Sequence, residues 1–312
     1  MLNQYKPEGH LIQDPENHDY LTSEIGLEKA VEKKKILEAT ALLCDASYDL
    51  HFDLFGMHAI MPRNEVQLMN NDETVKDIAV LTRVGKPVSF HIMGYSIDKS
   101  GKKTAILSRK SAQRECKEQY IETLVPGDII PATVTHLESF GAFVDIGCGI
   151  VSLLSIDSIS VSRITHPKDR LRVGDRIFVI VKSIDSLGRI YVSQKELLGT
   201  WEENVALFKT GETVMGTIRS IENYGVFVEL TPNLAGLAEV KEDLRVNETA
   251  AVYIKSILPD RMKIKLVIID TQPTKAALKP PKYFIDLSKT THLSYWRYSP
   301  DYAEKRIETI FE

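Results

Sequence analysis

The chain has 312 residues, enough for two or three ordinary domains, and its 43% hydrophobic and 26% charged content is typical of a globular protein in water. No apolar run reaches the length of a membrane helix, and the N-terminus lacks the basic-then-apolar layout of a signal peptide, so we expect a cytoplasmic protein. The formal net charge of −4 argues against a protein that binds duplex phosphates by bulk charge. The three cysteines are too widely spaced to predict a disulfide framework or a CxxC metal site.

Residues 1–35 are predicted to comprise a loosely ordered polar arm up to about Tyr20, followed by a helix over residues 23–35 with apolar residues at helical spacing. Short apolar segments separated by turn residues then indicate a first all-β domain over residues 36–110. Its strands are expected at 39–44, 50–55, 57–61, 87–95 and 104–108.

A helical connector over residues 111–124 leads to a second β domain, residues 124–198, which ends in a hairpin that turns at Ser186, Leu187 and Gly188. Another short helix, residues 200–208, precedes a third domain over residues 210–270. Five strands in this order, with the long connection between the third and the fourth, match the five-stranded OB barrel.

The last segment, residues 271–312, contains the proline-bearing linker LKPPKYF, and we expect it to end in a helix with Ser299 as N-cap and Pro300 at the first position. It is too apolar for a solvated extension, so it should fold back onto the third barrel or its connector and bury Trp296 and the 307–311 face. The predicted fold class is therefore all-β: three consecutive five-stranded OB barrels joined by short helices, plus a C-terminal α-helical tail.

One stretch, SFGAFVDIGCG, carries the functional argument. As a strand it places Ala142 and Val144 on the core face, and Gly141, Phe143 and Asp145 on the outer face, with Phe140 at the turn before it. Outward aromatic rings beside a glycine that allows close approach favour a stacking platform for bases. The alternative is that a neighbouring domain or helix covers the rings.

The same pattern occurs three times, which indicates a domain-sized internal repeat. NYGVFVEL places Tyr224 and Phe227 at the same spacing, and SYDLHFDL does so with Tyr48 and His51.

The segments PGDIIPATVTHLESFGAFVDIG and HPKDRLRVGDRIFVIVKSIDSLGRIYVSQKE resemble the RNA-binding repeat of ribosomal protein S1, which also occurs in polynucleotide phosphorylase. The whole chain, including its SYWRYSP tail, resembles the short S1 homologues of clostridia-type bacteria. In that family RNA contacts come from two aromatics of the second strand, a histidine on the third strand, and an Asp and an Arg on the last hairpin. In the second repeat the resemblance assigns these roles to Phe140, Phe143, Ser155, Asp185 and Arg189, with Ser155 in place of the family's histidine.

In the third repeat the resemblance assigns the roles to Tyr224, Phe227 and Lys263, with Glu239 at the histidine position, where its charge should weaken phosphate contact. The first repeat offers Tyr48 and His51, with Pro62 at the histidine position. Its MPRNEV segment resembles leading repeats of the family, which are associated more with docking to the ribosome than with gripping RNA.

Simple physical reasoning ranks the repeats in the same way. An aromatic ring stacks on any base, and an arginine pairs with a phosphate or lies on a ring face. The set Phe140, Phe143 and Arg189 is therefore the best candidate, and Tyr224, Phe227 and Lys263 come second. Three residues are expected to add polar contacts at the rim of the second barrel: Thr135, His136 and Lys182.

Other chemistry is poorly supported. The sequence contains no GxxxxGK[ST] loop and no HxxxH or HExxH pair, so no cofactor or metal is expected. Asp145 and Asp185 could be read as paired nuclease carboxylates, but a solvent-facing strand residue and a hairpin-turn residue are their more ordinary roles.

We therefore expect a monomeric, non-enzymatic protein that binds single-stranded RNA and works with the small ribosomal subunit in translation. The alternatives are an accessory factor in RNA turnover and a protein-interaction scaffold. The scaffold would be anchored by large aromatic side chains: Trp201, Tyr295, Trp296 and Tyr298.

Overall fold

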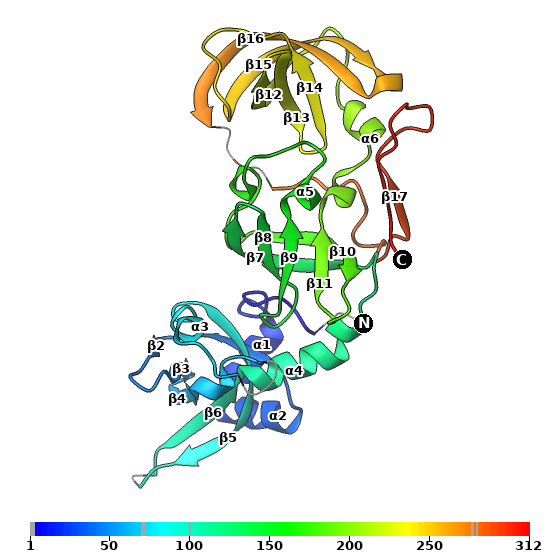
Figure 1. Cartoon of the computed structure of the whole chain (residues 1–312). Helices are drawn as coiled ribbons and strands as arrows, with labels where there is room; N and C mark the ends of the chain where they lie inside the picture. Colours follow the sequence, from blue (N-terminus) through cyan, green and yellow to red (C-terminus); the bar gives the residue numbers. More distant parts are fainter. Residues whose placement is uncertain (1–3, 70–72, 100, 276–277, 279) are drawn as a thin grey trace. The chain divides into compact units, whose positions relative to one another are not determined.

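The computed structural model describes residues 4–69, 73–99, 101–275, 278 and 280–312 (Figure 1). The chain divides into two compact units. Unit 1 comprises Met1–Leu124 with Asp145–Val151, and unit 2 comprises Val125–Val144 with Ser152–Glu312.

Unit 1 begins with an ordered arm, which corrects the expectation of a loose one; residues 1–3 of the predicted arm lie outside the described part. Helix α1 (Pro15–Leu21) is capped by Asp14, and α2 (Glu24–Glu32) by the hydroxyl of Ser23. The buried Glu38 carboxylate accepts backbone N–H groups from Gly9, Leu11 (2.7 Å) and Ile12 (3.0 Å). A buried carboxylate must be compensated by donors, and the arm supplies them, which is why this polar stretch is fixed.

The strands of unit 1 are β1 (Leu37–Thr40), β2 (Leu43–Cys44), β3 (Leu50–Leu54), β4 (Met57–Met61), β5 (Pro87–Ile97) and β6 (Lys103–Ser108). They form a sheet in the order β1-β5-β6-β4-β3-β2. The predicted first strand is broken at residues 41–42, so that β1 pairs with β5 and β2 pairs with β3. This sheet therefore has the pairing of a five-stranded barrel whose first strand is in two pieces, and it is not closed, which corrects the expectation of a closed first barrel. Its core includes Phe52 and Phe90.

Short helices complete unit 1. They are η1 (Arg63–Glu65), α3 (Asp77–Leu81), the connector helix α4 (Arg109–Gln119) and η2 (Ile121–Thr123).

The second barrel consists of β7 (Ile129–Glu138), β8 (Gly141–Asp145), β9 (Val151–Ser155), β10 (Arg176–Ile184) and β11 (Ile190–Ser193), closed in the order β10-β11-β9-β8-β7. Helices α5 (Ile156–Ile159) and η3 (Pro167–Asp169) lie in the long connection between β9 and β10. Ala142 and Val144 are fully buried, as the strand alternation predicts.

A connector of η4 (Lys195–Leu198) and α6 (Trp201–Val205) leads to the third barrel. Its strands are β12 (Thr213–Glu222), β13 (Gly225–Thr231), β14 (Leu234–Ala238), β15 (Glu248–Leu258) and β16 (Lys263–Lys275), with η5 (Pro259–Arg261) in the last hairpin. The barrel closes in the order β12-β13-β14-β16-β15. Leu237 opposite Lys265 repeats the parallel register of Leu153 opposite Tyr191, so the two barrels can be compared residue by residue.

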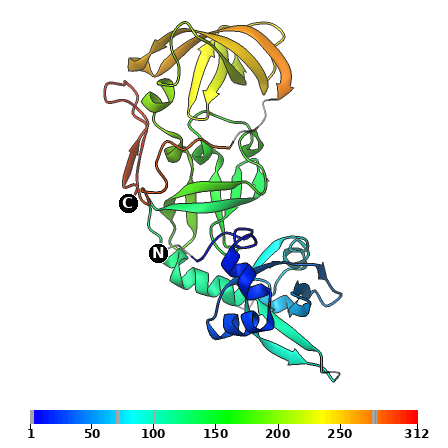
Figure 2. The ribbon, with the colours of Figure 1, turned by 180° about the vertical axis from the view of Figure 1, so that it is seen from behind.

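The expected C-terminal helix is wrong. The segment instead forms a two-stranded sheet of β17 (Tyr295–Arg297) and β18 (Glu308–Ile310), the red ribbon at the edge of Figure 2. Trp296 and Tyr298, two residues apart, enter the core of unit 2 together with Phe311, which follows β18. An extended segment presents alternate positions such as 296 and 298 to one side, where a helix would not. The predicted burial of Trp296 is confirmed at 7% exposure. Of the predicted 307–311 face, Phe311 is buried and Ile310 is exposed.

Candidate nucleic-acid interface

Two perpendicular phenylalanine rings form the centre of the candidate interface on the second barrel. Phe140, at the turn before β8, is 53% exposed, and its ring centroid lies 6.0 Å from that of Phe143 at an interplanar angle of 89°. Phe143 also stacks on His136 of β7, with centroids 6.3 Å apart and planes at 29°. The structure thus brings together three of the predicted contact residues.

Glycine at the start of β8 is needed for this arrangement. A Cβ on Gly141 would lie 2.5 Å from the carbonyl oxygen of Leu154 on the neighbouring strand, closer than any real contact. Gly141 therefore lets β8 approach β9 while the aromatic rings on either side of it in sequence remain at the surface.

Ser155 lies beside Phe140, because the amide N–H of Ile156 donates to the Phe140 carbonyl oxygen at 2.9 Å. Its hydroxyl contacts that of Ser158 (2.9 Å), which also accepts from the Lys182 ammonium (3.2 Å). Ser155 and Lys182 are thus joined through Ser158, a buried residue that sequence reasoning missed and that no pattern marks.

Asp185 and Arg189 are joined directly in the last hairpin. One carboxylate oxygen of Asp185 accepts the backbone N–H groups of Leu187 and Arg189 (both 2.9 Å), and the other accepts Arg189 Nε (2.7 Å). The backbone N–H of Arg189 and then the guanidinium itself lower the pKa of Asp185. Asp185 is therefore the hairpin-turn residue that was expected, and it orients an exposed Arg189 whose terminal nitrogens suit a phosphate.

Two further residues belong to this face and were missed. Tyr191 of β11 lies opposite Leu153, and its hydroxyl reaches Asp185 at 3.4 Å. Its alternation with Ile190 and Val192 is the signal that marks it as outward-facing. Glu138 holds the imidazole of His136 at 2.6 Å. Thr135, expected at the rim, donates to the Phe143 carbonyl oxygen at 3.1 Å and so supports β8.

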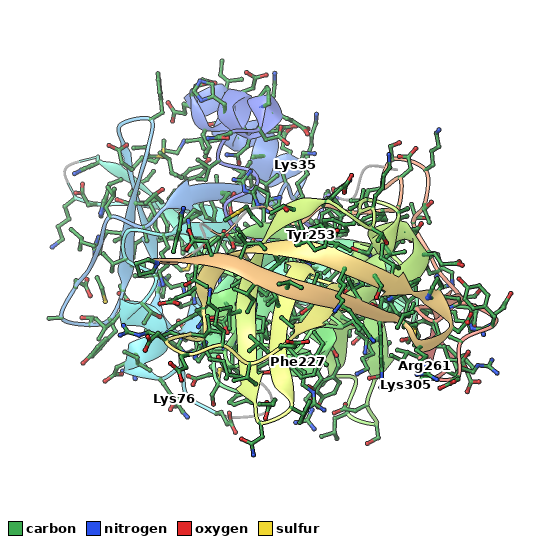
Figure 3. All side chains as sticks on the ribbon, turned by 90° about the horizontal axis from the view of Figure 1, so that it is seen from above. Lys35, Lys76, Phe227, Tyr253, Arg261 and Lys305 are labelled. Carbon is green, nitrogen blue, oxygen red and sulfur yellow. The ribbon has the colours of Figure 1, made fainter. Side chains whose placement is uncertain are left out.

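The third barrel repeats the aromatic pair. Tyr224, 72% exposed, meets Phe227 edge to face at 6.2 Å and 86°, and Phe227 is labelled among the yellow strands in Figure 3. Lys263 begins β16 at the position that Arg189 occupies before β11, and it is exposed. Glu239 is exposed directly after β14, so its predicted effect on phosphate contact stays a prediction. Lys265, opposite Leu237, is an additional cation that the alternation of β16 would have revealed.

In unit 1 the corresponding rings are engaged by their own neighbours. The Arg63 guanidinium lies over the Tyr48 ring, 4.9 Å from its centroid. His51 Nδ1 is 2.8 Å from His58 Nε2, and His51 Nε2 is 2.9 Å from the Asp45 carboxylate. Pro62, at the third-strand position, precedes η1. A base would have to displace these partners in order to stack here.

The expectation that Asp145 faces solvent is wrong. Asp145 is 2% exposed, and its carboxylate accepts N–H groups from Glu8 (2.7 Å), Gly147 (2.8 Å) and Gly149 (3.0 Å). Burial, followed by the charge of Glu8, raises the pKa of Asp145 to about 7. The corresponding Glu229 of the third barrel is also buried, bound by Arg170 (2.6 Å) and by Arg219 (2.8 Å). Both carboxylates are therefore structural.

Over the part of the chain that the structure describes, no group of three or more His, Cys, Asp or Glu side chains could hold a metal ion. Within the same residues, no helix is long and apolar enough to cross a membrane.

Comparison with known proteins agrees with this geometry. The family model of the S1 RNA binding domain matches residues 124–195, which is the second barrel with its flanks. Residues 124–195 therefore match the class of S1 RNA binding domains.

Comparison with individual proteins shows which S1-domain proteins the chain resembles. The chain is 36% identical to small ribosomal subunit protein bS1 of Staphylococcus saprophyticus (56% of this chain, 48% of that protein) and 32% identical to that of Leuconostoc lactis (54% and 40%). It is 28% identical to bS1 of Rhizobium meliloti over 72% of this chain and 38% of the relative. Over 54–72% of its length the chain is thus similar to members of the ribosomal protein S1 family; the finer resemblance to clostridia-type homologues stays a prediction. The chain spans less than half the length of these relatives.

Proposed function

We propose that this protein binds single-stranded RNA through the outer face of the second barrel and acts with the small ribosomal subunit in translation. The observation that carries the proposal is the perpendicular pair of exposed Phe140 and half-buried Phe143, with an exposed Arg189 in the last hairpin of the same barrel, which matches the S1 RNA binding domain. Each ring can hold one base, and the guanidinium can pair with the backbone between bases. The names of the relatives, which are small-subunit proteins, support the ribosomal partner.

Within this proposal the repeats have different tasks. The second barrel provides most of the affinity and the third provides a secondary site. The first domain docks on protein or on the ribosome, because Arg63 and His58 already occupy the positions where bases would stack. The protein works in the cytoplasm as a monomer without catalysing a reaction.

Most of the side chains that would anchor a protein-interaction scaffold are buried. Trp201, Trp296 and Tyr298 are buried in the core of unit 2, so they are not offered to a protein partner, and Tyr295 alone of the four is exposed. An accessory role in RNA turnover requires the same RNA-binding face and differs in the partner.

Two measurements test the proposal. Fluorescence anisotropy should show binding to a labelled single-stranded oligonucleotide and much weaker binding to a duplex of the same length, because stacking needs unpaired bases. Sedimentation of a lysate through a sucrose gradient should place the tagged protein with the small subunit. Equal affinity for duplex and single strand would contradict the platform, and sedimentation only with RNA-degrading complexes would favour the turnover role.

A further inference from the structure

Nearly buried ion pairs connect the second and third barrels at their junction. The Glu229 carboxylate of β13 is bound by Arg170, from the β9–β10 connection of the second barrel, and by Arg219 of β12. All three side chains are nearly buried, and Arg219 also donates to the carbonyl oxygen of Asp169 at 3.4 Å. Charged groups that are desolvated in this way hold a fixed geometry, because separating them would leave a buried charge unpaired.

A second contact inserts the β13–β14 turn of the third barrel against the second barrel and the connector. Asn233 is fully buried; its amide group donates to the carbonyl oxygens of Lys195 and Gly199 (both 2.8 Å) and accepts the N–H of Val161 (3.0 Å). The adjacent Pro232 carbonyl oxygen accepts from Ser162 at 3.2 Å.

The C-terminal segment binds to both barrels. On the second barrel, the Tyr283 hydroxyl accepts the N–H of Phe178 (2.8 Å), and Leu293 donates to the carbonyl oxygen of Gly127 (2.9 Å). On the third barrel, the Tyr298 hydroxyl donates to the carbonyl oxygen of Asn233. The segment 283–311 therefore contacts both barrels and connects them across the junction.

Each aromatic pair is linked to this junction through its own barrel. Phe140 accepts the N–H of Ile156 at the start of α5, and the chain then runs directly to Val161, which contacts Asn233. In the third barrel, Phe227 lies two residues before Glu229 on the same face of β13. In the sequence between the two pairs, the connection of residues 160–175 carries three exposed cations, Arg163, Lys168 and Arg172, and the preceding α5 carries the exposed carboxylate of Asp157.

From these contacts we propose that the second and third barrels form one rigid, two-site RNA-binding unit, in which a single strand passes from the Phe140–Phe143 pair across the junction to the Tyr224–Phe227 pair. This inference rests on the proposed function and adds the class of ligand, a strand long enough to engage two barrels at once. Residues such as Asn233 and Tyr298 are positioning residues: they touch no RNA and hold the two sites at a fixed separation. A second site at fixed distance is bound intramolecularly, which raises affinity without any new contact.

The test is the length dependence of binding by the full chain. The dissociation constant is measured for labelled oligouridylates from about 4 to about 32 nucleotides, since one OB barrel covers about 4–16. The wild-type protein should show a step of at least ~10-fold in affinity once the strand covers both barrels. Asn233→Ala should reduce this step and leave the affinity for the shortest bound oligomer unchanged, whereas Asn64→Ala, an exposed asparagine in unit 1, should behave as wild type.

Tyr298→Phe is the second variant, because it removes only the hydroxyl that bonds to Asn233 and retains the buried ring; it decides the question if Asn233→Ala does not fold. If every variant that folds shows an affinity step as large as that of the wild-type protein, the proposed role of the junction is wrong. A wild-type protein that binds short oligomers without any step would show two independent sites and overturn the rigid unit. If even the short oligomers do not bind, the proposed function itself fails.

Discussion

The Phe140 and Phe143 rings meet edge to face at 6.0 Å and 89°, and the Tyr224 and Phe227 rings repeat this relationship at 6.2 Å and 86°. In both barrels a buried glycine, Gly141 or Gly225, directly follows the first ring, and a Cβ on it would collide with the third strand. The geometry is therefore built by the turn into the second strand, and it presents two ring surfaces at right angles. Such an arrangement can hold two bases whose planes differ in direction.

Arg189 should neutralise one phosphate. We expect Arg189→Gln to weaken RNA binding and to reduce the log–log salt slope by about 0.7, the value for one phosphate on a single strand. The wild-type slope should itself be small, because the chain is net acidic. Anisotropy titrations at several salt concentrations measure both, with the exposed Arg261→Gln as a matched control. A slope that is unchanged in Arg189→Gln would show that the guanidinium does not contact the backbone.

We expect Glu229 to contribute mainly to the stability of the fold, through its buried ion pairs. Replacing it with alanine leaves Arg170 and Arg219 buried without their carboxylate, which is expected to cost about 3–5 kcal/mol. Denaturant unfolding of Glu229→Ala against the exposed Glu222→Ala measures the difference. If the free energy of unfolding decreases by less than about 1 kcal/mol, the ion pairs of Glu229 do not hold the two barrels together.

Glu38 contributes to the pH dependence of the stability of unit 1, together with Asp145, whose pKa is also raised to about 7. Burial, the largest influence, raises the pKa of Glu38 to about 7, although the N–H groups of the arm oppose the shift. A folded-state pKa above the unfolded value means that this group's contribution is fully present below about pH 4.5 and is lost as the pH rises through 7. The melting temperature of the wild-type protein should therefore decrease as the pH rises from 5 to 8. In Glu38→Gln this decrease should be smaller.

The exposed Glu118→Gln serves as the control for that series. The expected difference across the range is about 3 kcal/mol, from 1.36 kcal/mol per pKa unit. A melting temperature that rises with pH in the wild type would contradict the assignment.

The sequence alone predicts the strands of the barrels and the outward position of Phe143, because strand alternation and the repeated aromatic–glycine pattern are local signals. It fails at Asp145 and Glu229, which have the alternation of exposed residues but are covered by partners distant in sequence, Glu8 and Arg170. It fails for the tail in the same way. Ser299 and Pro300 are a valid helix start, yet Trp296 and Tyr298 gain more by entering the core as alternate strand residues. Local propensity is overridden wherever distant segments supply the burial.

The most direct test of the account is single-stranded RNA binding by the Phe140→Ala/Phe143→Ala double variant, measured together with its melting temperature. Stacking contributes about 1–3 kcal/mol per base, so each ring accounts for a roughly 5- to 150-fold change in affinity. The variant should lose affinity and keep its melting temperature, since Phe140 is exposed and Phe143 only half-buried; Val144→Ala, in the core, should lower the melting temperature, at a cost of about 1–4 kcal/mol. Unchanged affinity in a folded double variant would contradict the stacking platform, and so would a loss of affinity that merely follows a collapse of the melting temperature.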